Sequence, residues 1–324
     1  MNVQIELTNR CNLNCNFCIR NFWYADLHDL PFNLVVEILD MYDPDRVILY
    51  GYGEPTLYNQ LNDVIELAKR RAEVVIVTRN YRFYRDDVNL TYSIERYSDL
   101  SKLRRKVVSM ILTKDNIDEV KKVAEKSEKL YLTNLIPYSK DMYEKSVFVE
   151  ISKKSYDVCK DIVGDVKFLR DLVYFKDHAI QKYKEVLSDV GEVNLRYIVE
   201  KAERMRTAET FERFLLELKE NYDVDVPNVF ACDRKCPYED CVFVRADGKI
   251  FPCMELAYTH PLYLGYETLT VEGNYVDKSL PYPWCGDCQF LEGCWFVENG
   301  YDCYGNIPTC SRCLFSVGIA KCIL

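Results

Sequence analysis

The sequence predicts an α/β fold built on a parallel sheet, followed by a separate cysteine-rich segment. Two observations carry this prediction. Short runs rich in β-branched residues alternate with longer stretches of helical periodicity over the first part of the chain, which is typical of βαβ units. Of the 15 cysteines, eleven lie between Cys232 and Cys322. The change in cysteine density marks the clearest domain boundary in the sequence.

Each predicted element follows from its own stretch of sequence. The five clear strands cover residues 3–7, 47–50, 74–78, 107–112 and 130–135, and a sixth is placed near 166–169. The helical patterns between them cover residues 32–42, 61–71 and 117–129. Residues 177–222 are predicted to be mainly helical, with charges spread around apolar positions. We therefore divide the chain into residues 1–200, a helical linker at 201–231 and a cysteine-rich domain at 232–324.

Composition limits the classes of function. The 324 residues are 48% hydrophobic and 29% charged, as in a water-soluble globular protein, and the net charge is −9. Nucleic-acid binders concentrate positive charge, so we expect no nucleic-acid partner. No apolar run approaches the roughly 20 residues that span a bilayer, and the N-terminus lacks a signal segment. We expect a cytoplasmic protein with no membrane partner.

Three cysteines stand close together near the start of the chain, in "CNLNCNFC". Because the cytosol keeps thiols reduced, dense cysteine there indicates metal or redox chemistry. Cys11, Cys15 and Cys18 differ from a structural zinc site, which normally has four ligands in two pairs. Three thiolates on one loop can instead hold three irons of a cubic cluster and leave the fourth iron open for chemistry.

The loop after the second predicted strand reads "GYGEPTLY", from Gly51 to Tyr58. Its two glycines allow the backbone to approach a ligand closely. Glu54 adds a carboxylate at the end of the strand, where parallel α/β barrels gather their reactive groups. Taken alone, this loop is better explained as a plain turn before a helix, but its place one strand after the cysteines makes it a strong signal for binding.

These motifs together resemble those of the radical SAM enzymes: CxxxCxxC with an aromatic residue, Phe17, before the last cysteine, then a GGEP-like loop. The resemblance implies a partial (β/α)6 TIM-type barrel and a 4Fe-4S cluster on Cys11, Cys15 and Cys18. It further implies that S-adenosylmethionine (SAM) chelates the open iron. An electron, from a donor such as a ferredoxin, then cleaves SAM to methionine and a 5′-deoxyadenosyl radical, which abstracts hydrogen from the substrate.

The resemblance also suggests which residues contact SAM. Glu54 and the backbone of Gly51–Gly53 would hold its amino group, although Tyr52 replaces one of the usual adjacent glycines. Phe17 and Pro55 belong to the same motifs. Three further candidates stand at or near later strand ends and are equally well explained as ordinary turn or strand residues: Asn80, Ser109 on the fourth predicted strand, and Asn134. No catalytic side chain is identified.

The cysteine-rich segment resembles the SPASM extension of these enzymes, which carries auxiliary 4Fe-4S clusters. "CVFVRADGKIFPC" resembles its hairpin, with Gly248 five residues before a cysteine. The resemblance assigns one auxiliary cluster to Cys236, Cys241, Cys253 and Cys303, and a second to Cys285, Cys288, Cys294 and Cys313. Cys232, Cys310 and Cys322 are extra and any of them can displace a chosen ligand. Two structural zinc sites are the alternative.

The ending "DCYGNIPTCSRCLFSVGIAKC" resembles that of radical SAM/SPASM maturases for tungsten-cofactor oxidoreductases. The leading hypothesis is therefore a radical SAM enzyme that modifies a peptide or protein and matures a tungsten-containing oxidoreductase. Two alternatives remain. One is a radical SAM enzyme for a small molecule such as a pterin precursor. The other is a non-catalytic iron–sulfur electron carrier, which would need no SAM loop.

Overall fold

The computed structural model describes residues 1–21, 26–135, 142, 145–147, 149–152, 202–227, 229–231, 241–251, 254 and 257. The chain divides into two compact units. The first comprises residues 1–133, 221–226 and 238–276, and the second comprises the remainder. None of the helices in the described residues is long and apolar enough to cross a membrane.

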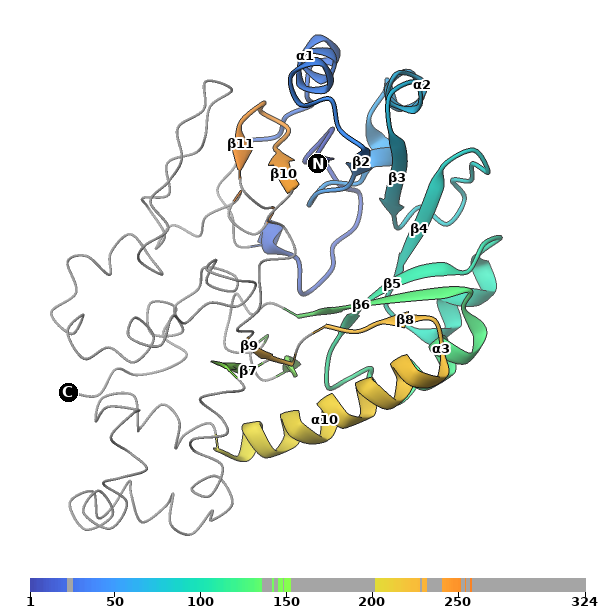
Figure 1. Cartoon of the computed structure of the whole chain (residues 1–324), viewed down its shortest axis with the longest axis vertical. Helices are drawn as coiled ribbons and strands as arrows, with labels where there is room; N and C mark the ends of the chain where they lie inside the picture. Colours follow the sequence, from blue (N-terminus) through green and yellow to red (C-terminus); the bar gives the residue numbers. More distant parts are fainter. Residues whose placement is uncertain are drawn as a thin grey trace, which may run out of the picture. The chain divides into compact units, whose positions relative to one another are not determined.

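The first unit is built around a nine-stranded sheet whose order is β11-β10-β1-β2-β3-β4-β5-β6-β8. Strands β1 to β6 therefore follow one another both along the chain and across the sheet (Figure 1). The pairs from β1 to β5 are all parallel, as expected for βαβ units. In chain order the strands are β1 (Asn2–Ile5), β2 (Arg46–Leu49), β3 (Glu73–Thr78), β4 (Asn89–Ile94), β5 (Val107–Leu112), β6 (Lys129–Asn134), β8 (Val224–Asp225), β10 (Cys241–Val244) and β11 (Ile250–Phe251).

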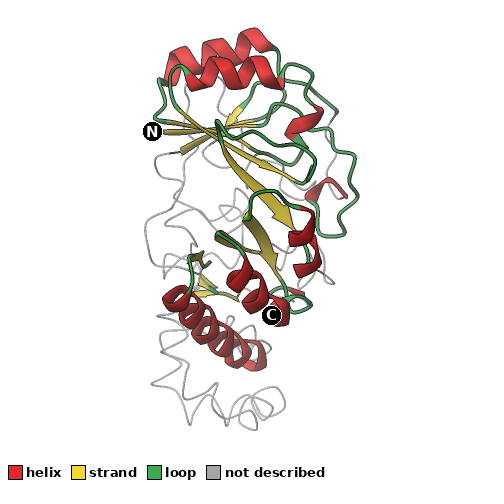
Figure 2. Cartoon of the chain, turned by 90° about the vertical axis from the view of Figure 1, so that its right-hand side faces the viewer, coloured by secondary structure: helices red, strands yellow, loops and turns green. Residues whose placement is uncertain are grey.

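The helices of this unit bury their apolar faces against the sheet. They are α1 (Phe32–Tyr42), α2 (Leu61–Lys69) and α3 (Ile117–Lys126). In α1, Val35, Ile38 and Leu39 are buried at the i, i+3, i+4 spacing that one helical face requires. Helix α1 ends where Asp43 adopts a left-handed conformation, with φ 39°. Helices α1 and α2 lie side by side over the same strands (Figure 2).

The sequence-based placement of these elements is largely confirmed, with one omission. Residues 89–94 form β4, a strand that the sequence analysis missed. Its sequence, NLTYSI, carries polar residues at alternate positions and lacks the continuous apolar character of its neighbours. Ser109 consequently lies on the fifth strand of the chain, β5, and not on the fourth. Helices α2 and α3 end two and three residues earlier than predicted, at Lys69 and Lys126.

A hairpin from the cysteine-rich part of the chain lies in the same sheet. Strand β10 pairs in parallel with β1, and β11 pairs antiparallel with β10. The turn between them is closed by the Gly248 N–H, which donates to the Arg245 carbonyl at 2.8 Å, and Gly248 has a φ of 83°. Only glycine adopts this conformation without strain. The hairpin expected around Gly248 is therefore present, and it extends the parallel sheet.

The second unit is described for a smaller share of its residues. Helix α10 (Ala202–Asn221) lies within the predicted helical stretch 177–222, and residues 177–201 lie outside the described part of the chain. Strand β7 (Val149–Ser152) pairs in parallel with β9 (Phe230–Ala231). The predicted sixth strand at 166–169 also lies outside the described residues. The proposed domain boundaries at 200 and 231 remain predictions.

Candidate radical and cofactor site

The three-cysteine loop begins directly after β1 and is closed at its base by side-chain hydrogen bonds. The Thr8 hydroxyl donates to Asp29 Oδ1 at 2.6 Å. The side-chain amide of Asn9 donates to the Asp26 carbonyl and its oxygen accepts the His28 N–H, both at 2.8 Å. These contacts join the residues before the cysteines to those that lead into α1. They fix the ends of the loop, so that the cysteines are presented at the carboxyl end of β1.

Within the loop, Cys15 and Cys18 lie on consecutive tight turns. The Cys18 N–H donates to the Cys15 carbonyl at 3.0 Å, and the Asn21 N–H donates to the Cys18 carbonyl at 3.1 Å. The second turn opens the short 3₁₀ helix η1 (Ile19–Asn21). The side-chain amide of Asn21 also donates to the Cys15 carbonyl, at 2.9 Å. Cys11, Cys15 and Cys18 are all free thiols at intermediate exposure.

This donor set fits a cubic iron–sulfur cluster better than a single metal ion. No three His, Cys, Asp or Glu side chains among the described residues converge as ligands of one ion. A cubic cluster requires no such convergence, because each thiolate binds its own iron corner. Burial raises the pKa of Cys15 to about 11, against the opposing effect of the Arg79 guanidinium, and burial likewise raises the pKa of Cys18. Iron binding must therefore displace thiol protons.

The GYGEP loop after β2 packs directly against the cysteine loop. A Cβ built on Gly53 would lie 1.9 Å from the carbonyl oxygen of Thr8, so only glycine allows the two backbones to approach this closely. The Glu54 N–H donates to the Arg10 carbonyl at 2.8 Å, one residue before Cys11. The structure thus brings together the two motifs that the sequence singled out, through backbone contacts on neighbouring strands.

A buried carboxylate that the sequence analysis missed joins this loop to the β10–β11 hairpin. Glu6 follows β1 and its side chain is 1% exposed. Its Oε1 accepts the Tyr52 N–H at 2.7 Å, and its Oε2 accepts the Ala246 N–H at 3.3 Å. A Cβ on Gly51 would lie 2.5 Å from Glu6 Cγ, which explains the first glycine of the motif. An acidic residue at the end of an otherwise apolar strand was the available signal.

Glu54 itself lies in a closed hydrogen-bond network. It is 5% exposed, and its Oε1 accepts the N–H and hydroxyl of Thr56 and the hydroxyl of Thr78. Its Oε2 accepts the Arg79 N–H at 3.0 Å. Pro55 begins the adjoining 3₁₀ helix η2 (Pro55–Leu57) and is buried. The carboxylate therefore links the end of β2 to the end of β3.

The three further candidates lie on three different strand ends or faces. Asn80 is exposed and closes a turn, with its Oδ1 accepting the Arg82 N–H at 3.2 Å. Ser109 is half-buried and pairs in register with Ser93 of β4. Asn134 is the last residue of β6 and is buried. Only Asn80 contacts the Glu54 network in the described contacts, by donating to the Thr56 hydroxyl at 3.2 Å.

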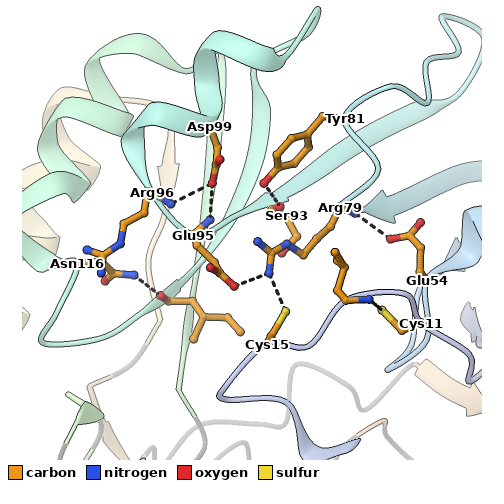
Figure 3. Close-up of polar contacts among 12 residues, drawn as sticks. Cys11, Cys15, Glu54, Arg79, Tyr81, Ser93, Glu95, Arg96, Asp99 and Asn116 are labelled. Atoms are coloured by element: carbon orange, nitrogen blue, oxygen red, sulfur yellow. Dashed lines mark hydrogen bonds and ion pairs between the residues drawn. The ribbon is translucent and has the colours of Figure 1, made fainter.

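Arg79, between Thr78 and Asn80, makes the contact that links the third and fourth strand ends to the cysteine loop. Its Nη1 donates to Cys15 Sγ at 2.8 Å and also to Glu95 Oε1 (Figure 3). Glu95 directly follows β4, so its omission from the sequence analysis follows from the missed strand. The backbone N–H groups of Glu95 and Arg96 donate to Asp99 Oδ2 at 3.2 and 3.3 Å. Asp99 therefore holds the turn that presents Glu95.

Tyr81 packs beside this ion pair. Its hydroxyl donates to the Ser93 carbonyl at 3.2 Å, and its ring meets that of Tyr92 edge to face. Burial, and secondarily the Asp99 carboxylate, raise the pKa of Tyr81 to about 12. The phenol is therefore neutral at physiological pH and acts as a hydrogen-bond donor here.

Only one auxiliary cysteine lies among the described residues. Cys241 is 9% exposed and opens β10, where it pairs with Asn2 at the amino end of β1. The cysteine loop follows the opposite end of the same strand, about 10 Å further along at the usual rise of a strand. The other assigned auxiliary ligands lie outside the described residues: Cys236, Cys253, Cys285, Cys288, Cys294, Cys303 and Cys313. So do Cys232, Cys310 and Cys322.

Comparison with known proteins bears on this arrangement. Residues 5–134, which contain both motifs and β2 to β6, match the Radical SAM superfamily. This stretch is therefore similar to radical SAM domains. The match supports a SAM-dependent enzyme and implies a 4Fe-4S cluster and SAM as cofactors, as the motifs indicated.

One curated relative and several solved structures resemble the chain over most of its length. A Pyrococcus furiosus protein named as a tungsten-containing aldehyde ferredoxin oxidoreductase cofactor-modifying protein is 23% identical over 98% of this chain and 96% of its own. The structure of anSMEcpe with AdoMet and the Cp18Cys peptide gives a TM-score of 0.45 at 13% identity, covering 98% of this chain and 96% of the other. Streptococcus suis SuiB bound to the precursor peptide SuiA gives 0.41 at 14% identity, covering 92% and 70%. Since both TM-scores lie below 0.5, the domain assignment rests on the superfamily match.

Proposed function

We propose that this radical SAM enzyme modifies a peptide or protein, and that its target is a tungsten-containing oxidoreductase. The observation that supports a radical SAM enzyme is the backbone contact between the two loops. Gly53 lies against Thr8, and the Glu54 N–H donates to Arg10, so the three thiols stand beside the GYGEP loop. An electron carrier needs no second loop of this kind. The geometry favours an enzyme that holds a small cofactor next to its cluster.

Different side chains of this site would bind the cluster and fix the glycine loop. Cys11, Cys15 and Cys18 would hold the cluster. When bound, the cluster would supply the electron that cleaves the sulfonium of SAM. Glu6 fixes the backbone of the glycine loop at the Tyr52 N–H, and Glu54 fixes its far end to Thr78. Glu54 Oε1 accepts three hydrogen bonds from the protein and Oε2 accepts one, so Oε2 keeps a lone pair for a further donor. We therefore assign the SAM amino group to Glu54 Oε2 and the backbone carbonyls of Gly51–Gly53.

The finer parts of the proposal concern the rest of the chain. We propose that the parallel sheet is a partial barrel of the (β/α)6 TIM type and that residues 232–324 form a SPASM-like domain with two auxiliary clusters. The hairpin around Gly248 supports this, since its turn lies between Cys241 and Cys253, two of the assigned auxiliary ligands. The target follows from the relative of Pyrococcus furiosus, whose named role is cofactor modification and whose length this chain matches. A ferredoxin-type donor and a cytoplasmic location complete the proposal.

An anaerobic assay tests the enzyme class. The protein is reconstituted with iron and sulfide, supplied with SAM and a strong reductant, and assayed for 5′-deoxyadenosine beside a Cys15→Ala variant. We expect deoxyadenosine from the wild type alone. Iron should approach about twelve atoms per chain if three four-iron clusters form. Deoxyadenosine from neither protein, with all clusters present and with the tungsten-free oxidoreductase added, would instead indicate an electron carrier.

A second assay tests the target. The metal-free oxidoreductase or its peptides are incubated with the complete system, and the mass of each is compared before and after. A mass change that requires both SAM and Cys15 supports the proposal. Turnover of SAM without any change in the oxidoreductase, together with conversion of a pterin precursor, would transfer the assignment to a small-molecule substrate.

A further inference from the structure

We propose that Arg79 is a positioning residue that sets the reduction potential of the N-terminal cluster, through a hydrogen bond to the Cys15 sulfur that Glu95 holds in place. This inference rests on one part of the proposed function, namely that Cys11, Cys15 and Cys18 bind a cluster. It does not depend on the substrate. Neither Arg79 nor Glu95 belongs to the motifs that the sequence analysis used.

The geometry fixes Arg79 at both ends. Its backbone N–H donates to Glu54 Oε2 at 3.0 Å, so the Glu54 network holds its main chain. Its Nη1 donates to Cys15 Sγ at 2.8 Å and to Glu95 Oε1 (Figure 3). The arginine side chain is only 21% exposed. A guanidinium is planar and permanently charged, so its direction and its charge are both constant.

Glu95 is itself held in a rigid turn. Asp99 accepts the N–H groups of Glu95 and Arg96 and forms an ion pair with Lys102 at 2.7 Å. The 3₁₀ helix η3 (Tyr97–Lys102) follows at once. Since Glu95 is 39% exposed, its ion pair with Arg79 contributes little to stability in water. The pair is better explained by what it does to the position of the guanidinium.

A hydrogen bond of this kind persists when the sulfur binds iron, because a thiolate bound to one iron keeps lone pairs that accept hydrogen bonds. Potentials of iron–sulfur clusters depend on such bonds, on nearby charge and on exposure. Reduction adds one negative charge to the cluster. A fixed cation at the sulfur therefore stabilises the reduced form and raises the potential, whereas the Glu95 carboxylate opposes it. The two residues should act with opposite signs.

The test uses the full-length reconstituted protein and a redox titration followed by electron paramagnetic resonance. The signal that is absent from the Cys15→Ala protein belongs to the N-terminal cluster. We expect Arg79→Gln to lower its midpoint enough to change the ratio of oxidised to reduced cluster about tenfold, equivalent to about 59 mV for one electron. Glu95→Gln keeps an oxygen that accepts from Arg79 but removes the negative charge, so it should raise the midpoint. The midpoint of Arg79→Lys should lie between those of the wild type and Arg79→Gln.

Arg82→Gln is the matched control, because Arg82 is an exposed arginine three residues further along the same loop. It carries the same change of charge and should leave the midpoint unchanged. Equal shifts in Arg79→Gln and Arg82→Gln would overturn the proposal, since they would show only an effect of net charge. If Arg79→Gln loses iron and its midpoint cannot be measured, the Glu95→Gln variant provides the test. A lowered or unchanged midpoint of the N-terminal cluster in Glu95→Gln would overturn the proposal.

The outcomes also separate this inference from the proposed function. Opposite shifts in the Arg79 and Glu95 variants, without any modified oxidoreductase or peptide, would support the role of Arg79 and refute the target. A wild-type spectrum identical to that of Cys15→Ala would overturn both, because no cluster would then be bound at Cys15.

Discussion

Two glutamates stand on either side of Arg79, and they differ in almost every physical respect. Glu54 follows β2, is 5% exposed and is surrounded by four donors from the protein. Glu95 follows β4, is 39% exposed, and contacts the guanidinium of Arg79. The first binds the main chain of Arg79 and the second binds its side chain.

This difference shows that the conspicuous residue of a motif can also hold neighbouring loops together. Glu54 lies within GYGEP and attracts attention in the sequence, yet its carboxylate holds two loops together. Glu95 belongs to no motif, yet it lies one contact away from a cysteine that should bind iron. The Glu54 carboxylate therefore links the ends of two strands, and Glu95 is exposed enough to tune the site.

The largest effect on stability and SAM binding is expected from Gly53→Ala, in the loop that contains Glu54. The new methyl group would lie 1.9 Å from the Thr8 carbonyl oxygen, so one backbone must move. Overpacking of this kind costs about 1–3 kcal/mol, and displacement of the loop should also abolish SAM binding. Thermal unfolding and equilibrium dialysis with SAM measure the two effects.

Gly51→Ala is the matched control for this change, since the nearest atoms to its Cβ belong to the Glu6 side chain, which can shift. We expect a smaller loss of stability than for Gly53→Ala. A Gly53→Ala protein as stable as the wild type would contradict the close contact between the two loops.

The two glutamates can be compared directly by the same substitution. Glu54→Gln replaces an acceptor oxygen by an amide that faces donors, so it should lower the free energy of unfolding by about 1–3 kcal/mol. Glu95→Gln should lower it by less than about 1 kcal/mol, because the ion pair is partly exposed. Denaturant unfolding of the two variants beside the wild type measures the contrast, and equal losses would refute it.

A smaller effect is expected at Asp99, which holds the Glu95 turn. Burial would raise the pKa of Asp99, but the Lys102 ammonium and two backbone N–H groups outweigh it and lower the pKa below the ordinary 3.8. A lowered pKa means that the carboxylate stabilises the fold above pH 3.8 and that this contribution disappears as the pH falls through the lowered value. Asp99→Asn should cost about 1 kcal/mol at pH 7, because it removes the charge that accepts the Lys102 ammonium and the two N–H groups.

The difference between wild type and Asp99→Asn should therefore shrink between pH 4 and more acidic conditions, as measured by denaturant unfolding. Asp86→Asn, at an exposed position, serves as the control and should change stability by less than about 0.5 kcal/mol at any pH. A constant difference for Asp99→Asn across this range would exclude the proposed role of its charge.

Much of the first unit could be predicted from local pattern alone. Strands β2, β3 and β5 contain apolar runs, β1 and β6 alternate polar and apolar residues, and α1 to α3 show helical spacing. Strand β4 was missed in the sequence analysis because Asn89, Thr91 and Ser93 interrupt its apolar character. Those positions are explained by the sheet: Thr91 pairs with Val77, and Ser93 pairs with Ser109. Pairing with neighbours, rather than propensity, makes this stretch a strand.

In the candidate site, too, contiguous motifs could be predicted from the sequence, whereas contacts between remote residues could not. The resemblance to radical SAM enzymes rests on two contiguous motifs, and the superfamily match confirms it. Arg79 and Glu95 were missed because their significance lies in contacts between separate strand ends. Glu6 was missed because its partners, Tyr52 and Ala246, are remote in the chain. No spacing rule in a single sequence indicates such contacts.

The pairing of β1 with β10 has a consequence for how the chain is made. Residue 2 pairs with residue 241, so one edge of β1 stays open until the ribosome has released most of the chain. An open strand edge can pair with other chains and so favours aggregation. Contacts between such distant residues also form slowly. Proteins shortened before the hairpin should therefore precipitate during synthesis, even though all three cysteines of the first loop and the whole GYGEP loop are present.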